Sequence, residues 1–144
     1  MRTNILLVIA TAALGFVSGQ QPSNSDVEKY QGAWQATFMI DANGSPVAED
    51  EVRNSHLLVE GDRFTLRTKD AVIKGTFTLD PSRTPKAIDV VLDGQKPEEK
   101  LLGIYQIDGE LRKSCFALSG MERPKDFDPK AKNHIQFGWK PRAK

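Results

Sequence analysis

The single cysteine and the two histidines are the side chains that could support nucleophilic catalysis in this sequence. Cys115 would need a base that is oriented by a third group, and His56 and His134 are the histidines available. The residues around Cys115 do not resemble a nucleophile elbow or a cysteine-protease signature. We therefore predict that the protein is not an enzyme. Cys115 is expected to be a small buried strand residue, and pairing with an outside thiol is the alternative if it is exposed.

Metal-binding patterns are weak as well. The two histidines are far apart in the sequence and have no ligand-spaced partner, so they do not indicate zinc. Glu122, Asp126 and Asp128 are close enough to bind calcium loosely, but the central glycine of a calcium-binding loop is missing. We predict no metal site and no cofactor, and we interpret Gly120–Asn133 as a solvated charged loop.

Length and charge exclude several other classes. The chain has 144 residues, which corresponds to one domain. It carries 20 Lys and Arg against 19 Asp and Glu, so no basic excess points to nucleic acid or an anionic membrane surface as a partner. One cysteine rules out an internal disulfide framework.

Residues 1–19 have the three-part form of a secretory signal peptide. Arg2 supplies the positive charge, Ile5–Val17 contains no charged residue, and Val17-Ser18-Gly19 places small residues before a cleavage site at Gln20. The apolar stretch is short for a membrane span, although an uncleaved anchor is the alternative. We predict a periplasmic or secreted protein with no stable membrane insertion after cleavage.

The rest of the chain shows the period-two alternation of strands. Trp34, Ala36, Phe38 and Ile40 fall on one face of the first strand. Turn residues such as Gly61-Asp62 and Asp108-Gly109 separate later strands. The sequence also predicts a helical turn near 26–30 and a short helix near 48–54. Strand candidates lie at 34–40, 56–60, 63–68, 72–79, 87–92, 101–107, 111–118 and 134–139.

Eight short consecutive strands without long crossovers predict an all-β antiparallel meander, because parallel connections need a dozen or more residues. Closing the sheet into an eight-stranded up-and-down barrel buries its apolar face and removes its edges. We expect a polar linker and helical turn at 20–29, the barrel at 30–140 and a basic tail at 141–144. The barrel interior would be either filled or open to one small ligand.

The chain resembles the lipocalin-like (calycin-type) barrels, and more specifically an uncharacterised planctomycete family of exported lipocalin-like domain proteins. The resemblance implies a fold in which Gly32 and Trp34 help to close the barrel base, but no established activity. The opening signature is Tyr30-Gln31-Gly32-Ala33-Trp34; the other matching segments are 61–66, 75–82, 85–89, 102–105, 108–109, Cys115, 122–124 and Phe127.

One strand departs from the apolar pattern of that family. Arg112 and Ser114 share a face with Phe116, so all three would point inward if Phe116 does. The resemblance to lipocalin-like fatty-acid carriers implies that Arg112 anchors an acidic ligand, with Ser114 and Tyr105 adding hydrogen bonds. The alternative is that the head of Arg112 reaches water or a local carboxylate beside the Asp108-Gly109 turn.

Two functions are consistent with these features. The first is an exported, non-enzymatic binding module that holds a small apolar or amphipathic ligand; the sequence does not define a protein partner. The second is a structural or interaction domain of the cell envelope, with no small-molecule ligand. In the second case the barrel would be plugged by aromatic residues, namely Trp34, Phe38, Phe64, Phe77 and Trp139. Cavity volume distinguishes the two.

Overall fold

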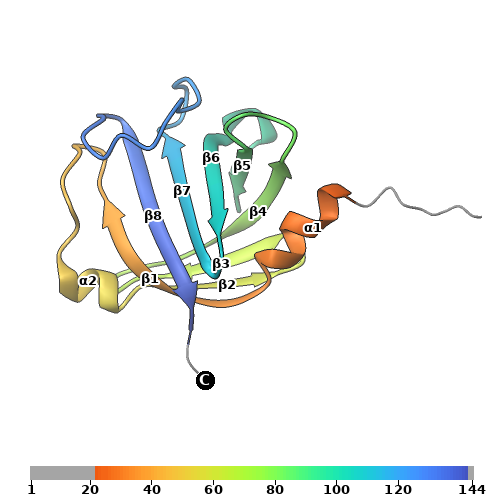
Figure 1. The fold of residues 1–144 in the computed structure, drawn as a ribbon. Helices are drawn as coiled ribbons and strands as arrows, with labels where there is room; N and C mark the ends of the chain where they lie inside the picture. The colour runs from red at the N-terminus through yellow and green to blue at the C-terminus, as the bar shows by residue number, and fades with distance from the viewer. Residues whose placement is uncertain (1–21, 143–144) are drawn as a thin grey trace, which may run out of the picture.

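Eight antiparallel strands follow one another around a closed barrel in the computed structural model, which describes residues 22–142 (Figure 1). The signal peptide predicted at residues 1–19 lies outside the described residues. No helix within residues 22–142 is both long and apolar enough to cross a membrane. The strands are β1 (Gly32–Ile40), β2 (His56–Glu60), β3 (Arg63–Arg67), β4 (Val72–Asp80), β5 (Ala87–Leu92), β6 (Leu101–Asp108), β7 (Leu111–Ala117) and β8 (His134–Pro141). The helices are α1 (Pro22–Lys29), α2 (Glu49–Arg53) and the short 3-10 helix η2 (Pro97–Glu99).

Each strand pairs with its neighbours in the sequence, and the antiparallel pairing of β1 with β8 closes the barrel. The predicted eight-stranded up-and-down barrel is therefore confirmed. Gly61 and Asp62 form the predicted two-residue turn between β2 and β3. The turn between β6 and β7 is shifted by one residue, because Asp108 pairs with Leu111 and leaves Gly109 and Glu110 as the loop.

The predicted inward faces are correct for most strands but wrong for the second half of β1. A register shift between Ala36 and Phe38 interrupts the pairing of β1 with β8. A bulge of this kind exchanges the two faces of a strand. Met39 consequently packs against the core, while the ring of Phe38 lies on the outer face against Gly138. A side chain at Gly138 would collide with that ring, so Phe38 does not plug the barrel.

The two ends of the barrel differ. Hydrogen bonds place α1 at the same end as the β2–β3, β4–β5 and β6–β7 connections, and we call it the closed end. The other, open end carries the remaining connections. Helix α1 is longer than the predicted single turn and begins at Pro22. The predicted short helix near 48–54 is confirmed as α2, which contributes Val52 to the core.

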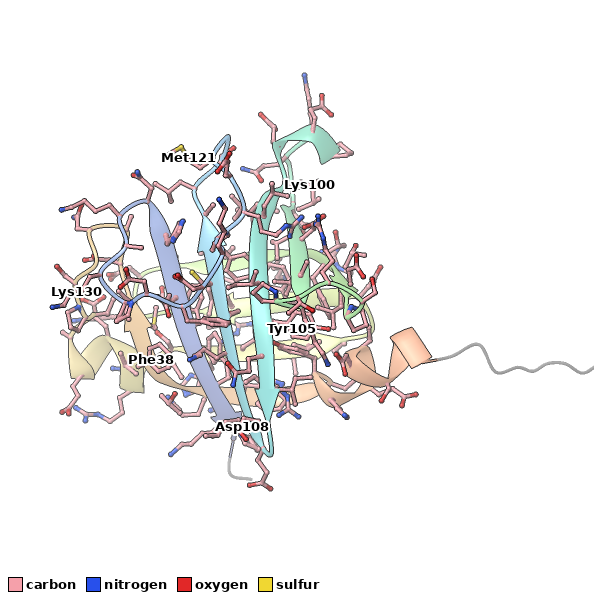
Figure 2. The ribbon with its side chains drawn as sticks, turned by 45° about the horizontal axis from the view of Figure 1, so that its top comes forward. Phe38, Lys100, Tyr105, Asp108, Met121 and Lys130 are labelled. Atoms are coloured by element: carbon pink, nitrogen blue, oxygen red, sulfur yellow. The ribbon has the colours of Figure 1, made fainter. Side chains whose placement is uncertain are left out.

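The β7–β8 connection, residues 118–133, packs on the outer face of the sheet, as Figure 2 shows between Met121 and Lys130. Arg123 donates from Nη1 to the carbonyls of Ile88 and Gly103, at 3.3 and 2.8 Å. The same nitrogen lies 2.7 Å from a carboxylate oxygen of Asp89, as an ion pair without hydrogen-bond geometry. The prediction of a solvated charged loop is therefore only partly right. Much of the loop is exposed, but Arg123 attaches it to the sheet.

Beneath that loop lies Cys115, which is fully buried on the outer face of β7 opposite Ile104. The expectation that Cys115 is a small buried hydrophobic residue is confirmed. Burial raises the pKa of the Cys115 thiol to about 11, with a smaller contribution from the charge of Asp126. The thiol therefore stays protonated at neutral pH and is a poor nucleophile.

Replacing Arg123 with Ala should uncover Cys115, because three contacts that hold the loop on the sheet are lost. We expect a thiol reagent at pH 8 to label Cys115 about tenfold faster in this variant, since an opening that costs about 1.4 kcal/mol less is populated tenfold more. Lys125→Ala, an exposed change in the same loop, is the control. Equal labelling rates in the two variants would show that Arg123 does not hold the loop.

Candidate ligand-binding cavity

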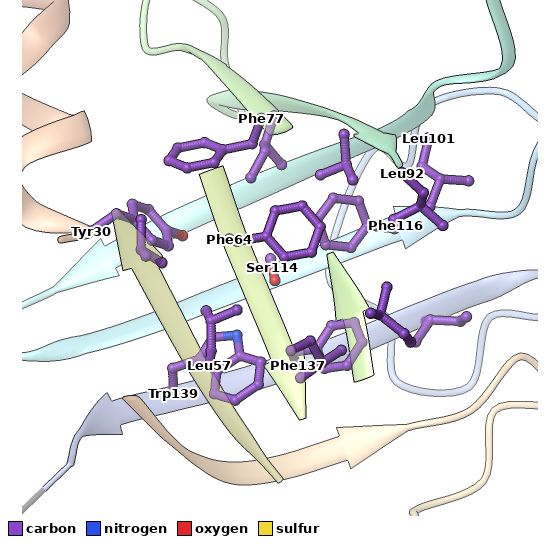
Figure 3. A pocket seen from close by; sticks show the side chains of 16 residues that line it. Tyr30, Leu57, Phe64, Phe77, Leu92, Leu101, Ser114, Phe116, Phe137 and Trp139 are labelled. Carbon is purple, nitrogen blue, oxygen red and sulfur yellow. The ribbon is translucent and has the colours of Figure 1, made fainter. Parts of the chain in front are cut away.

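The barrel encloses an apolar cavity of about 280 Å³ (Figure 3). Its wall is formed by inward side chains of every strand from β2 to β8 and by Tyr30, which precedes β1. None of these lining residues is charged. The lining consists of Tyr30, Leu57, Val59, Phe64, Leu66, Ile73, Phe77, Ile88, Val90, Leu92, Leu101, Ser114, Phe116, Ile135, Phe137 and Trp139.

The cavity is reached from the open end of the barrel. Lining residues near the closed end, such as Val59 and Phe77, are buried. Those near the open end, such as Leu92 and Leu101, are only half-buried. This gradient in exposure describes a pocket with a sealed base and an accessible mouth, which is the usual form of a small-molecule site in a barrel.

A layer of aromatic side chains seals the base. The ring of Tyr30 packs against those of Trp34, Phe77 and Tyr105, with centroid separations of 5.8 to 6.4 Å. The indole nitrogen of Trp34 donates to the carbonyl of Tyr30 at 2.8 Å. Gly32 makes the bend from α1 into β1 with φ of +111°, a conformation that side-chain-bearing residues rarely adopt. Gly32 is therefore required for its backbone conformation and not for lack of space, since a methyl group there would touch nothing.

Arg112 lies beneath this aromatic layer and is 7% exposed. Its guanidinium carbon is 4.9 Å from the ring centroid of Trp34. Nε and Nη2 donate to the carbonyl of Lys29, and Nη1 donates to those of Gly109 and Leu111. Arg112 points inward, as periodicity predicted, but it does not line the cavity. Its hydrogen bonds attach α1 and the β6–β7 turn to the base of the barrel. Its partners are backbone carbonyls, and not the water or local carboxylate of the alternative given above.

Tyr105 belongs to a second polar contact at the closed end. Its hydroxyl donates to a carboxylate oxygen of Asp26 at 2.6 Å, and Lys86 donates to the same oxygen at 2.9 Å. Asp26 lies on α1 and is 6% exposed, so the contact connects the helix to β6 and to the β4–β5 connection. Tyr105 does not line the cavity either.

The polar groups of the cavity wall are the hydroxyls of Tyr30 and Ser114 and the indole N–H of Trp139. Figure 3 shows the Tyr30 hydroxyl pointing towards the centre of the cavity and Ser114 placed farther along the wall. Ser114 was expected at the site from its shared face with Phe116, and the structure places both there. Tyr30 was not expected to face a ligand, because it precedes the strand and carries no period-two signal.

Replacing Arg112 with Leu should destabilise the protein, because the carbonyls of Lys29, Gly109 and Leu111 lose their donor at a buried position. We expect the free energy of unfolding in urea to fall by about 3 kcal/mol. Arg112→Lys should recover only part of it, since an ammonium cannot reproduce the planar fork. The control is Arg67→Leu on the exposed face of β3. If Arg112→Leu is no worse than this control, Arg112 does not hold the closed end.

Asp26 should make stability depend on acid pH. Burial raises its pKa, but the hydrogen bonds from Tyr105 and Lys86 and the charges of Lys86 and Lys29 outweigh that effect, so the net pKa is lowered. A lowered native pKa contributes stability above the usual value of 3.8, and that contribution is lost as the pH falls through the native pKa. Asp26→Asn should cost about 1–3 kcal/mol at neutral pH.

The deficit of Asp26→Asn should be constant between about pH 5 and 8 and shrink below about pH 4, when the wild-type carboxylate is also protonated. Urea unfolding at a series of pH values measures it. A deficit that persists undiminished well below the lowered pKa would contradict the assignment of this pH dependence to Asp26.

Comparisons with known proteins do not extend this description. No protein-family model matches the chain, and no curated protein matches it either. Membership of the planctomycete family therefore stays a prediction, whereas the eight-stranded barrel is observed directly.

Proposed function

We propose that this protein is an exported, non-enzymatic, lipocalin-like binding module that holds a small apolar or amphipathic ligand inside its barrel. The observation that carries the proposal is the apolar cavity with a sealed base and an accessible mouth. Its volume of about 280 Å³ is close to the lower end of the range for small-molecule sites.

The cavity favours a carrier over a structural domain with a filled barrel. Phe64, Phe77 and Trp139 stand around the cavity wall and leave its centre open, whereas Phe38 lies outside. Two inward glycines, Gly75 and Gly103, leave room at the wall for the rings of Phe64 and Phe116, because an added methyl group would lie only 3.0 and 2.6 Å from the respective ring. The aromatic residues therefore line space rather than fill it.

Two further parts of the proposal rest on other observations. The form of residues 1–19 supports export and cleavage before Gln20. The non-enzymatic role is supported by the protonated, buried thiol of Cys115 and by a cavity wall without a carboxylate, an imidazole or a charged side chain.

Native mass spectrometry of the protein purified from its own cells tests the proposal directly. We expect a reproducible bound mass that is released by denaturation. Protein that is persistently free of bound mass, and that also fails to take up a small apolar compound, would favour the filled structural domain instead.

Filling the cavity should abolish uptake of butylbenzene, a purely apolar probe, as measured by calorimetry. The double variant Leu57→Trp with Val90→Phe places the added bulk in the cavity. Leu58→Trp with Val91→Phe makes the same change of composition on the outer faces of the same strands, where Leu58 is 41% exposed. We expect at least about tenfold weaker binding in the first variant and unchanged binding in the control. Equal loss in both, or in neither, would place the binding elsewhere.

A further inference from the structure

We infer that the ligand carries an uncharged head group with a hydrogen-bond acceptor, such as a ketone or ester, which the Tyr30 hydroxyl holds at the base of the cavity. This inference rests on the proposed function and specifies its ligand class. The geometry that carries it is a buried phenol at the sealed end of a pocket whose other polar groups are the Ser114 hydroxyl and the indole N–H of Trp139.

The Tyr30 hydroxyl is buried and has no hydrogen-bond partner among the described residues. The residue as a whole is 5% exposed, and its hydroxyl is directed towards the cavity (Figure 3), where neighbouring side chains cover the oxygen in the ligand-free barrel. A buried donor without a partner costs about 1–3 kcal/mol, so such groups in native proteins call for an explanation. A ligand acceptor that displaces the side chains covering this oxygen at the base would remove that cost.

The chemistry of the wall selects a neutral acceptor. Burial raises the pKa of Tyr30 well above its usual value, so the phenol keeps its proton and donates it. Ser114, the other hydroxyl of the wall, can donate or accept. Neither group is charged, and transfer of an unpaired carboxylate from water into such a wall is strongly unfavourable.

Arg112 does not provide a positive charge that could pair with a carboxylate ligand in the cavity. Its guanidinium carbon lies 5.9 Å from the ring centroid of Tyr30, beneath the aromatic layer. Nε and both terminal nitrogens already donate to backbone carbonyls. An acidic ligand would have to displace those contacts, and with them the attachment of α1, before it could form an ion pair.

The size of the cavity limits the ligand. An apolar cavity of about 150 Å³ in another protein accommodates benzene, so the volume here fits roughly a dozen non-hydrogen atoms. Three probes of this size separate the chemistries: methyl octyl ketone has a neutral acceptor, decanoate has a charged one and butylbenzene has none.

Calorimetry with the mature protein should show that the ketone binds about tenfold more tightly than butylbenzene, as one hydrogen bond predicts, and more tightly than decanoate. Tyr30→Phe should weaken ketone binding about tenfold and leave butylbenzene binding unchanged. The matched control is Tyr105→Phe, which removes an equivalent phenol from the closed end, where its partner is Asp26 and not the cavity. This control should leave the binding of both probes unchanged.

The stability of the ligand-free variants provides a second readout. Tyr30→Phe should unfold at the same temperature as the wild type or a higher one, whereas Tyr105→Phe should unfold at a lower one because Asp26 loses a donor. Tighter binding of decanoate than of the ketone, or an unchanged ketone affinity in Tyr30→Phe, overturns the inference while the proposed function stands. Failure of all three probes to bind the wild type overturns both.

Discussion

The pairing of β1 with β8 is the contact on which the rest of the structure depends, because it converts a meander of eight strands into a barrel with an inside. Once the barrel is closed, α1 can cover one end, where Arg112 and Asp26 attach it to the β6–β7 turn and to β6. The contacts of these two buried charged side chains therefore lie at the closed end. The space above them remains apolar, so the same closure that stabilises the fold also defines the character of the cavity.

Much of the fold follows from period-two patterning and turn chemistry. The inward sets of β2 to β5 were predictable because each strand keeps its alternation between recognisable turns. Phe38 was assigned to the wrong face, since nothing in the local sequence marks the bulge before it. The packing of residues 118–133 was also missed, because a loop rich in charges hides the carbonyl contacts of Arg123. Such contacts depend on strands that are distant in the sequence.

The site was less predictable than the fold. Periodicity correctly turned Arg112 and Ser114 inward, but depth along the strand decides what each one meets. Ser114 lies at the level of the cavity, whereas Arg112, two residues nearer the turn, lies beneath the aromatic layer among carbonyl oxygens. Tyr30 reaches the cavity from the end of α1, and only the three-dimensional closure of the base shows that its hydroxyl is the polar group there. The period-two pattern of strands could not have identified Tyr30, because this residue precedes β1.

A crystal structure of the mature protein soaked with methyl octyl ketone tests the central claim most directly. Our account predicts continuous density inside the barrel, with the alkyl chain towards the open end and the ketone oxygen within hydrogen-bond distance of the Tyr30 hydroxyl. Aromatic side chains that collapse into the cavity would contradict it. So would a ketone bound only on the outer surface, for instance in the hollow between Arg83 and Phe127.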